Sequence, residues 1–158
     1  MRPSSTDGPV LIDHATLTSP VPGPYQSWIE SSGMSSNPLS GPFEDPDLDG
    51  VPNLLEFAFQ TPPLSTQPTG PNGIPVVSIV PIAGGGETLA VDFTAVVGAV
   101  YNIETTADPH VTQSPENPGG WRAVQNLTVP APGGYHWQSP LPVLPGQRQF
   151  VRIRVTLP

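Results

Sequence analysis

Apolar and polar residues alternate along most of the chain beyond residue 74, which is the pattern of strands with one buried face. In 89–95 every odd-numbered position is apolar, and 151–157 repeats this pattern, whereas Thr88, Asp92 and Thr94 would face the other way. Short apolar runs occupy 76–80, 89–97, 100–103, 121–129 and 150–157. Turns rich in glycine and proline would separate the strands at 84–86, 97–98, 119–120, 133–134 and 145–146. The pattern predicts a mainly β protein, and we expect an antiparallel β-sandwich of the immunoglobulin or fibronectin III kind.

Two short helices are expected before the β-rich region. The first covers 25–32, because a proline precedes it and a glycine follows it. The second covers 53–60, where apolar residues recur four positions apart and share helix faces. Prolines at 62 and 63 would end this helix. We expect the helical segment to pack against the sheets through Trp28, Ile29, Phe43, Leu55 and Phe59.

Composition divides the chain into an N-terminal arm at 1–23, a helical segment at 24–65 and a β-sandwich domain at 66–158. The arm holds one predicted strand, followed by a proline-rich stretch at 20–24. Such a strand can pair with a sheet of its own subunit or insert into the open edge of the next subunit. Insertion between subunits would be head-to-tail and would produce a filament. The residues of this candidate assembly strand are Val10, Leu11, Ile12, Ala15 and Leu17.

Charge and composition exclude several functional classes. The 158 residues include 13 acidic and 5 basic ones, with a formal net charge of −8, whereas nucleic acids and anionic membranes are bound by clustered Lys and Arg. The chain has no lysine and no cysteine, which excludes Schiff bases, phosphate-loop lysines and thiol nucleophiles. No apolar stretch is long enough to span a membrane, and the first seven residues lack the apolar core of a secretory signal.

The strongest chemical signal is an acidic loop at 45–56, which matches the pattern D-x-D-x-D-G-x5-E at every specified position. Ca²⁺ prefers about six to eight oxygen ligands, and a loop of this spacing supplies them from one short piece of chain. Gly50 at position six would allow a sharp turn of the backbone. The expected ligands are the side chains of Asp45, Asp47 and Asp49, the backbone carbonyl of Val51, Asn53 directly or through water, and a bidentate Glu56.

A solvated acidic turn before a helix, with Asp49 as its N-cap, is the alternative interpretation of this loop. Five acidic residues between positions 44 and 56 would repel one another without a cation, which favours the calcium interpretation. The loop is EF-hand-like, but prolines at 38 and 42 exclude an entering helix in register. Pro52 at position eight has no N–H to bridge a partner loop. A single structural site is therefore expected, and not a regulatory pair.

The order of 25–29 and then 45–58 resembles the calcium loop and helix of dockerin-like and thrombospondin type 3-like segments in secreted bacterial proteins. The remaining sequence resembles the C-terminal β-sandwich modules that follow such segments, on the basis of 100–104, Trp121 and 149–155. The resemblance implies an extracellular or cell-surface accessory module without catalysis of its own. The chain has one loop where dockerins have two.

Other candidate sites carry weaker signals. The histidines at 14, 110 and 136 are far apart and lack a second ligand nearby, which argues against a transition-metal site. Asp92 and Glu104 could oppose each other on neighbouring strands, as a glycosidase requires. Arginines at 152 and 154 are expected to balance carboxylates on neighbouring strands. Aromatic faces that could stack on a sugar ring, or instead fill the core, belong to Trp121, Tyr135 and Trp137.

The sequence therefore favours a non-catalytic, calcium-stabilised extracellular structural or assembly module. Its partners would be further copies of itself or other cell-surface components, and its cofactor would be Ca²⁺. A carbohydrate-binding module of a secreted protein, with a polysaccharide as ligand, is the alternative.

Overall fold

The computed structural model describes residues 22–66, 73–110, 120–144 and 146–158. The candidate assembly strand lies outside these described residues. Two helices come first in the chain, α1 (Pro24–Ser31) and α2 (Asn53–Phe59). Six strands follow, β1 (Val76–Pro81), β2 (Glu87–Ala95), β3 (Val100–Thr106), β4 (Arg122–Leu127), β5 (Gly133–Gln138) and β6 (Phe150–Thr156). In these described parts of the chain, no helix is long and apolar enough to cross a membrane.

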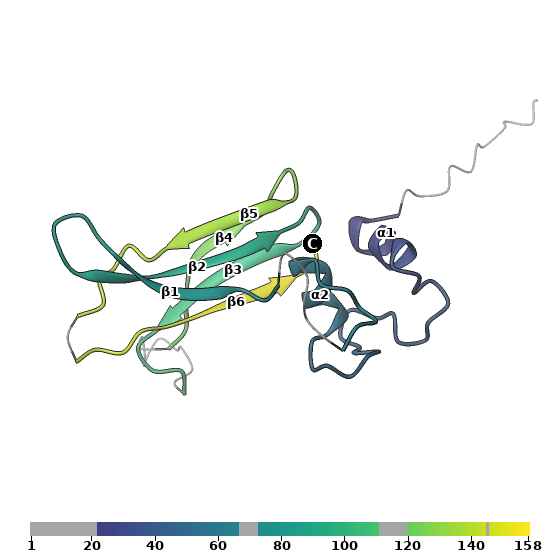
Figure 1. Ribbon diagram of the computed structural model, residues 1–158, viewed down its shortest axis with the longest axis horizontal. Coiled ribbons are helices and arrows are strands. Elements are labelled where there is room, and N and C mark those ends of the chain that lie inside the picture. The colour runs from purple at the N-terminus through teal and green to yellow at the C-terminus, as the bar shows by residue number, and fades with distance from the viewer. Residues whose placement is uncertain (1–21, 67–72, 111–119, 145) are drawn as a thin grey trace, which may run out of the picture.

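The strands form two antiparallel sheets of three strands each, so the protein is mainly β (Figure 1). One sheet has the order β1-β2-β5 and the other has the order β4-β3-β6. The longest strand, β2, lies in the centre of its sheet, and β3 lies in the centre of the other. The β3–β4 register shifts between Ile103 and Glu104, whereas the β3–β6 register is continuous.

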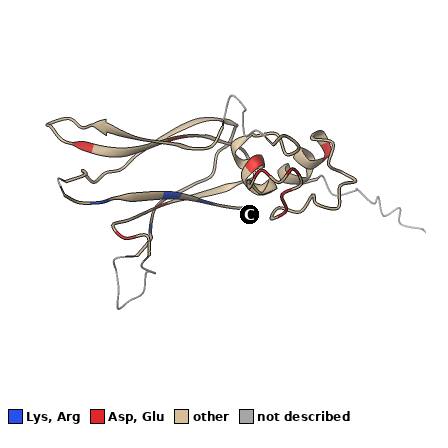
Figure 2. Cartoon of the chain, turned by 60° about the horizontal axis from the view of Figure 1, so that its bottom comes forward, with Lys and Arg blue, Asp and Glu red and all other residues tan. Residues whose placement is uncertain are grey.

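The two sheets and α2 share one hydrophobic core. Figure 2 shows the sheets one above the other, with the helices at one end of the strands. The burial of these apolar groups is the main favourable contribution to folding. The core consists of Leu54, Phe57, Ala58, Phe59, Val91, Phe93, Ala95, Val96, Ala99, Tyr101, Ile103, Trp137 and Val155.

A buried tyrosine connects α2 to the sheets. The Tyr101 side chain is 0% exposed, and its hydroxyl donates a hydrogen bond to the Ala58 carbonyl at 2.8 Å. The same hydroxyl accepts a hydrogen bond from the Val96 N–H, also at 2.8 Å. The end of α2 and the β2–β3 turn are therefore joined by one side chain. Burial raises the pKa of Tyr101 to about 12, so it remains a neutral donor.

Both faces of β2 are largely buried. Thr88 and Thr94 are expected on the opposite face from the apolar row, and their side chains are buried as well. Thr88 is fully buried because its hydroxyl has the carbonyls of Ser139 and Leu141 within hydrogen-bonding distance. A buried hydroxyl with such a partner does not carry the full desolvation penalty. Asp92 is exposed, as expected.

The two helices are confirmed to within one residue, but two other predictions are wrong. Residues 133–134 do not form a turn, because they begin β5 and pair with Ala95 and Thr94. Phe43 does not pack against the sheets, since its side chain is 81% exposed. Trp28, Leu55 and Phe59 do contribute to the core or pack against it.

Candidate metal centre

The acidic loop folds through hydrogen bonds from its own backbone to its aspartates. The Leu48 and Gly50 N–H groups donate to Asp45, at 2.8 and 2.9 Å. Asp47 accepts from the Asp49 N–H at 3.3 Å, and Asp49 accepts from the Val51 N–H at 2.8 Å. Short polar side chains that bond to the backbone two or three residues later stabilise tight turns of this kind. The loop is therefore held in a conformation that turns around its three aspartates.

Two loop residues adopt positive φ angles that this conformation requires. Gly50 has φ 90°, which glycine adopts without steric cost, as its place in the motif predicts. Leu48 has φ 62°, which is unfavourable for a residue with a Cβ atom. Its side chain is 84% exposed, so no apolar burial compensates for the backbone strain.

The three aspartates are brought together. Asp45, Asp47 and Asp49 each offer one carboxylate oxygen, and these oxygens lie within 4.8 Å of one another. Three negative charges at this separation repel, unless a cation or protons neutralise them. The pKa of Asp47 is raised above its usual value, chiefly by burial, with Asp49 and Asp45 among the further causes. One Asp47 oxygen is buried and has no hydrogen-bond partner.

Glu56 presents a buried carboxylate to this cluster from the first turn of α2. Its side chain is 1% exposed, and its Oε2 atom has no hydrogen-bond partner. Burial raises its pKa to about 7, and the charges of Asp47, Asp49 and Asp45 contribute to the shift in that order. Glu56 is not part of the group whose oxygens lie within 4.8 Å, but the aspartates are close enough to influence its ionisation.

Asn53 has a structural role that the motif does not reveal. It is fully buried, and its side-chain amide donates to the carbonyls of Leu39 and Gly41, at 2.7 and 2.8 Å. Its backbone N–H donates to the Glu44 carbonyl at 2.9 Å. Asn53 therefore fastens the segment before the loop to the start of α2. Its side-chain oxygen is buried and unpartnered. This oxygen is therefore free to coordinate a cation, or to accept a hydrogen bond from a water that does so.

The interpretation of Asp49 as a helix N-cap is wrong. The residue before α2 is Pro52, and no side chain caps the first turn. Asp49 instead accepts from the Val51 N–H within the loop. Val51 itself lies between Gly50 and the start of α2, at the position where the motif uses a backbone carbonyl.

The chemistry of the donor set fits a hard divalent cation. All the candidate side-chain donors are oxygens, which suits Ca²⁺ and Mg²⁺ better than softer transition metals. Buried oxygens without partners occur on Asp47, Asn53 and Glu56, all of them within the motif. A buried carboxylate without a partner costs free energy, and coordination to a cation would remove that cost.

The three aromatic residues considered for sugar binding do not share one environment. Trp137 is 5% exposed and belongs to the core, so it offers no ring face to solvent. Tyr135 packs against Phe93, with ring centroids 5.3 Å apart. The Trp121 ring is covered by the Arg152 guanidinium at 4.2 Å from its centroid. The described residues therefore provide no row of open aromatic faces at these positions.

The carboxylates considered for glycosidase chemistry lie in different sheets. Asp92 is on β2, and its Oδ1 atom lies 2.7 Å from Nδ1 of His136. Glu104 is on β3 and forms ion pairs with Arg152 and Arg154 of the adjacent β6, at 2.7 and 3.1 Å. The expectation that these arginines balance a carboxylate on a neighbouring strand is confirmed. Asp92 and Glu104 are not opposed on neighbouring strands as that prediction required.

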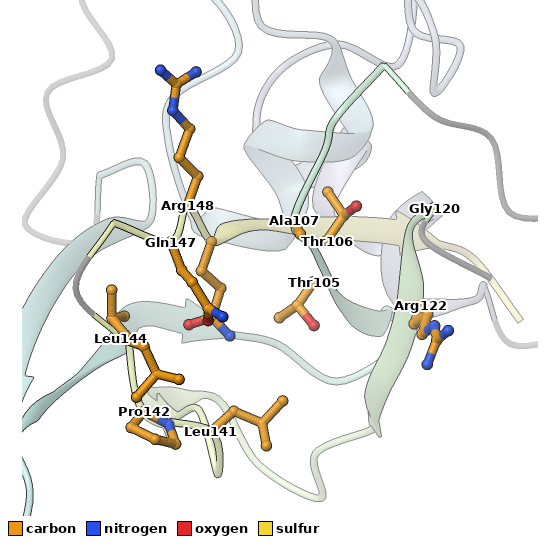
Figure 3. Close-up of a pocket in the computed structure, with 12 residues that line it drawn as sticks. Thr105, Thr106, Ala107, Gly120, Arg122, Leu141, Pro142, Leu144, Gln147 and Arg148 are labelled. Carbon is orange, nitrogen blue, oxygen red and sulfur yellow. The ribbon is translucent and has the colours of Figure 1, made fainter. Parts of the chain in front are cut away.

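A hollow of about 390 Å³, which no sequence pattern predicts, lies near the end of the sheets opposite the helices. Figure 3 shows the side chains around it, from the end of β3, the start of β4 and 141–149. Of the described residues that line it, only Arg122 and Arg148 are charged. The residues come from segments far apart in the sequence, so only the fold brings them together. The described residues of its lining include no carboxylate, histidine or serine for acid–base or nucleophilic chemistry.

No protein-family model, curated protein or solved structure matches this chain.

Proposed function

We propose that this protein is a non-catalytic structural module that Ca²⁺ stabilises through the loop at 45–56. The observation that carries the proposal is the Glu56 side chain, which is buried, has an unpartnered Oε2 atom and lies near enough to three aspartates for their charges to affect its pKa. Evolved proteins seldom bury a carboxylate without a partner, because the cost is several kcal/mol unless the group is neutralised. A bound cation accounts for its position, and a solvated acidic turn does not.

The module would act by fastening its helical segment to its sheets. Glu56 lies on α2, whose residues Leu54, Phe57, Ala58 and Phe59 belong to the shared core. A cation held between the loop and Glu56 would therefore link 45–51 to that core. The proposed metal ligands are Asp45, Asp47, Asp49, the Val51 carbonyl, Asn53 and Glu56. We expect a weak affinity, with a dissociation constant of about 10⁻⁴ to 10⁻³ M, as in extracellular calcium modules.

The finer architecture we propose is an antiparallel β-sandwich of the immunoglobulin or fibronectin III kind. The two three-stranded sheets and their common core support it. A dockerin-like or thrombospondin type 3-like calcium loop would precede this sandwich. Calcium is abundant outside cells, so a weak site of this kind suits an extracellular or cell-surface location. In that setting we propose that the module assembles with further copies of itself through its N-terminal strand.

Thermal melting in chelator and in millimolar calcium tests the calcium proposal. A cation that binds only the folded protein raises its stability by mass action. We expect the melting temperature to rise with calcium and to continue rising above the dissociation constant. Magnesium at the same concentration should have a smaller effect, because it requires a tighter octahedral geometry. Melting curves that coincide in chelator and in calcium would refute the proposal.

A further inference from the structure

Two partly apolar hollows lie on one open side of the molecule, between the outer edges of β1 and β6. Within the described parts of the chain, β1 pairs only with β2 and β6 pairs only with β3. One hollow of about 220 Å³ has Val77 on one wall and Val151 and Ile153 on the other. A second hollow of about 470 Å³ is lined by Ile79 and Phe150, among others. We refer to these two hollows together as the edge groove.

Apolar side chains of β1 are exposed along this groove. Val77 and Ile79 are 53% and 59% exposed, although both line the hollows between the sheets. Their cross-strand partners on β2, Val91 and Leu89, are 1% and 8% exposed. Contiguous exposed apolar surface on a soluble protein commonly marks a binding site. Unpaired backbone groups along an edge strand are also the template to which another strand can add.

The opposite side of the two sheets is bridged. There Gln125 of β4 donates a hydrogen bond to the hydroxyl of Tyr135 on β5. Tyr135 in turn packs against Phe93 in the core. The uncovered side is therefore the one bordered by β1 and β6.

The composition of the remaining chain indicates which segment can fill the groove. Residues 67–72 contain no large apolar side chain, and 111–119 contain only one, a valine. By contrast, five of the eight residues in 10–17 have aliphatic side chains. A strand of eight residues is about 26 Å long, and the six residues of β1 span about 20 Å. The N-terminal segment therefore has the length and the apolar content of a strand that would cover the groove.

Charge also matches between the segment and the groove. Arg148 lines the second hollow, is exposed, and has no ion pair among those found in the described residues. Figure 3 shows its side chain extending away from the other labelled residues. In a strand, Asp13 would lie on the same face as Leu11, Ala15 and Leu17. That face would bring one carboxylate into a groove that contains an arginine.

We propose that residues 10–17 of one molecule add as a β-strand to the edge groove of a second molecule. The inference rests on the assembly role proposed above, and it identifies the surface that accepts the strand. Prolines at 20, 22 and 24 favour an extended, stiff connection. The connection enters α1, which lies beyond the ends of the strands (Figure 1). A stiff connection that starts at this helix favours an acceptor groove on another molecule over the groove of the same molecule.

Two substitutions, each made in the whole 158-residue chain, test the strand and its acceptor groove separately. Leu11→Asp places a charge on the strand and leaves the groove intact, and Ile79→Asp does the reverse. We expect analytical ultracentrifugation to show that the unsubstituted protein assembles as its concentration rises. Each variant alone should associate at least about tenfold more weakly than the unsubstituted protein. An equimolar mixture of the two variants should form one-to-one dimers, because it contains one intact strand and one intact groove.

Val124→Asp is the matched control for the groove variant. Val124 is 42% exposed on β4, in the other edge of its sheet. This substitution should leave assembly unchanged. In addition, Arg148→Asp should weaken association about tenfold, and adding Asp13→Arg to the same chain should restore it. Circular dichroism of each variant checks that it is folded.

An unsubstituted protein that stays monomeric at all concentrations would overturn the proposal, as would variants that assemble normally. A monomer that Leu11→Asp destabilises would show that the strand folds onto its own molecule, which also contradicts addition between molecules. The calcium-dependent melting shift is measured on Leu11→Asp in parallel. A retained shift with lost assembly supports both proposals, whereas assembly without a calcium shift would refute only the calcium proposal.

Discussion

Glu56 is the residue on which the effect of calcium is expected to depend most strongly. Glu56→Gln removes the buried charge but keeps the shape of the side chain. In chelator we expect this variant to be more stable than the unsubstituted protein at pH 8, because no carboxylate must ionise in the core. In calcium we expect it to lose most of the melting shift, because the amide is a poorer ligand.

Glu44→Gln is the matched control for this prediction. Glu44 lies beside the loop and is exposed, so its charge should affect stability little in either condition. A Glu56→Gln variant that keeps the full calcium shift would contradict the assignment of Glu56 as a ligand.

The raised pKa of Glu56 also predicts a pH dependence in chelator. The folded protein has a Glu56 pKa of about 7, against an ordinary value of 4.5 for the exposed group. The folded state therefore holds the proton more tightly than the unfolded state. Its stabilising contribution is present below pH 4.5 and is lost as the pH rises through about 7. We expect the melting temperature in chelator to fall between about pH 5 and 8, and calcium to offset the fall. An equal fall in Glu56→Gln would assign the effect to other groups.

Gly50 tests the backbone conformation of the loop separately from its charges. Its φ of 90° is unfavourable for alanine, and no heavy atom lies within 4 Å of the position that a Cβ would take. Gly50→Ala should therefore destabilise the protein by backbone strain alone, by about 1–2 kcal/mol. Gly23 is the control, because it has an ordinary φ of −64° and equal open space. Chemical denaturation of the two variants measures the difference, and equal stabilities would contradict the conformation of the loop.

At the scale of single residues, the motif predicted which side chains would gather but not how they are supported. The spacing of the three aspartates was sufficient to predict that they gather, because the turns between them are local and form through neighbouring backbone N–H groups. The bonds from Asn53 to Leu39 and Gly41 cross more than ten residues, so no local pattern encodes them. The exposure of Phe43 was missed for the same reason, since hydrophobicity alone does not specify a packing partner.

At the scale of elements, the junction between α2 and the sheets depends on Tyr101. Tyr101→Phe removes the bond to the Ala58 carbonyl and leaves the buried Val96 N–H without its acceptor. We expect a loss of about 1–3 kcal/mol in the free energy of unfolding. Tyr25→Phe is the comparison, since its hydroxyl makes a single, partly buried bond to the Ser40 carbonyl. A loss no larger than that of Tyr25→Phe, measured by urea denaturation, would contradict this role of Tyr101.

The elements themselves were largely predictable because helix and strand periodicities differ. The limits of β5 were not, since glycines at 133–134 indicate a turn until pairing with β2 is known. Glycine in a strand is unfavourable by itself, so the cross-strand partners decide its conformation. The burial of Thr88 and Thr94 was not predicted, because hydrogen bonding and packing, and not polarity alone, decide burial in a central strand.

At the scale of the whole molecule, α2 and both sheets should unfold together. Residues of α2 lie in the same core as those of β2 and β3, so the proposed calcium site is linked to that core. Acidic residues gather at the helix end of the molecule in Figure 2, where the cation would act. Differential scanning calorimetry should therefore show one transition that calcium moves to higher temperature as a unit. A separate, calcium-sensitive transition beside an unchanged main one would contradict this coupling.

Anomalous X-ray diffraction from crystals grown in calcium locates the cation itself. We expect an anomalous peak inside the loop at 45–56, with oxygens of Asp45, Asp47, Asp49 and Glu56 at about 2.3–2.6 Å from it. A well-ordered loop without such a peak, with the Glu56 carboxylate still buried and protonated, would contradict the calcium proposal.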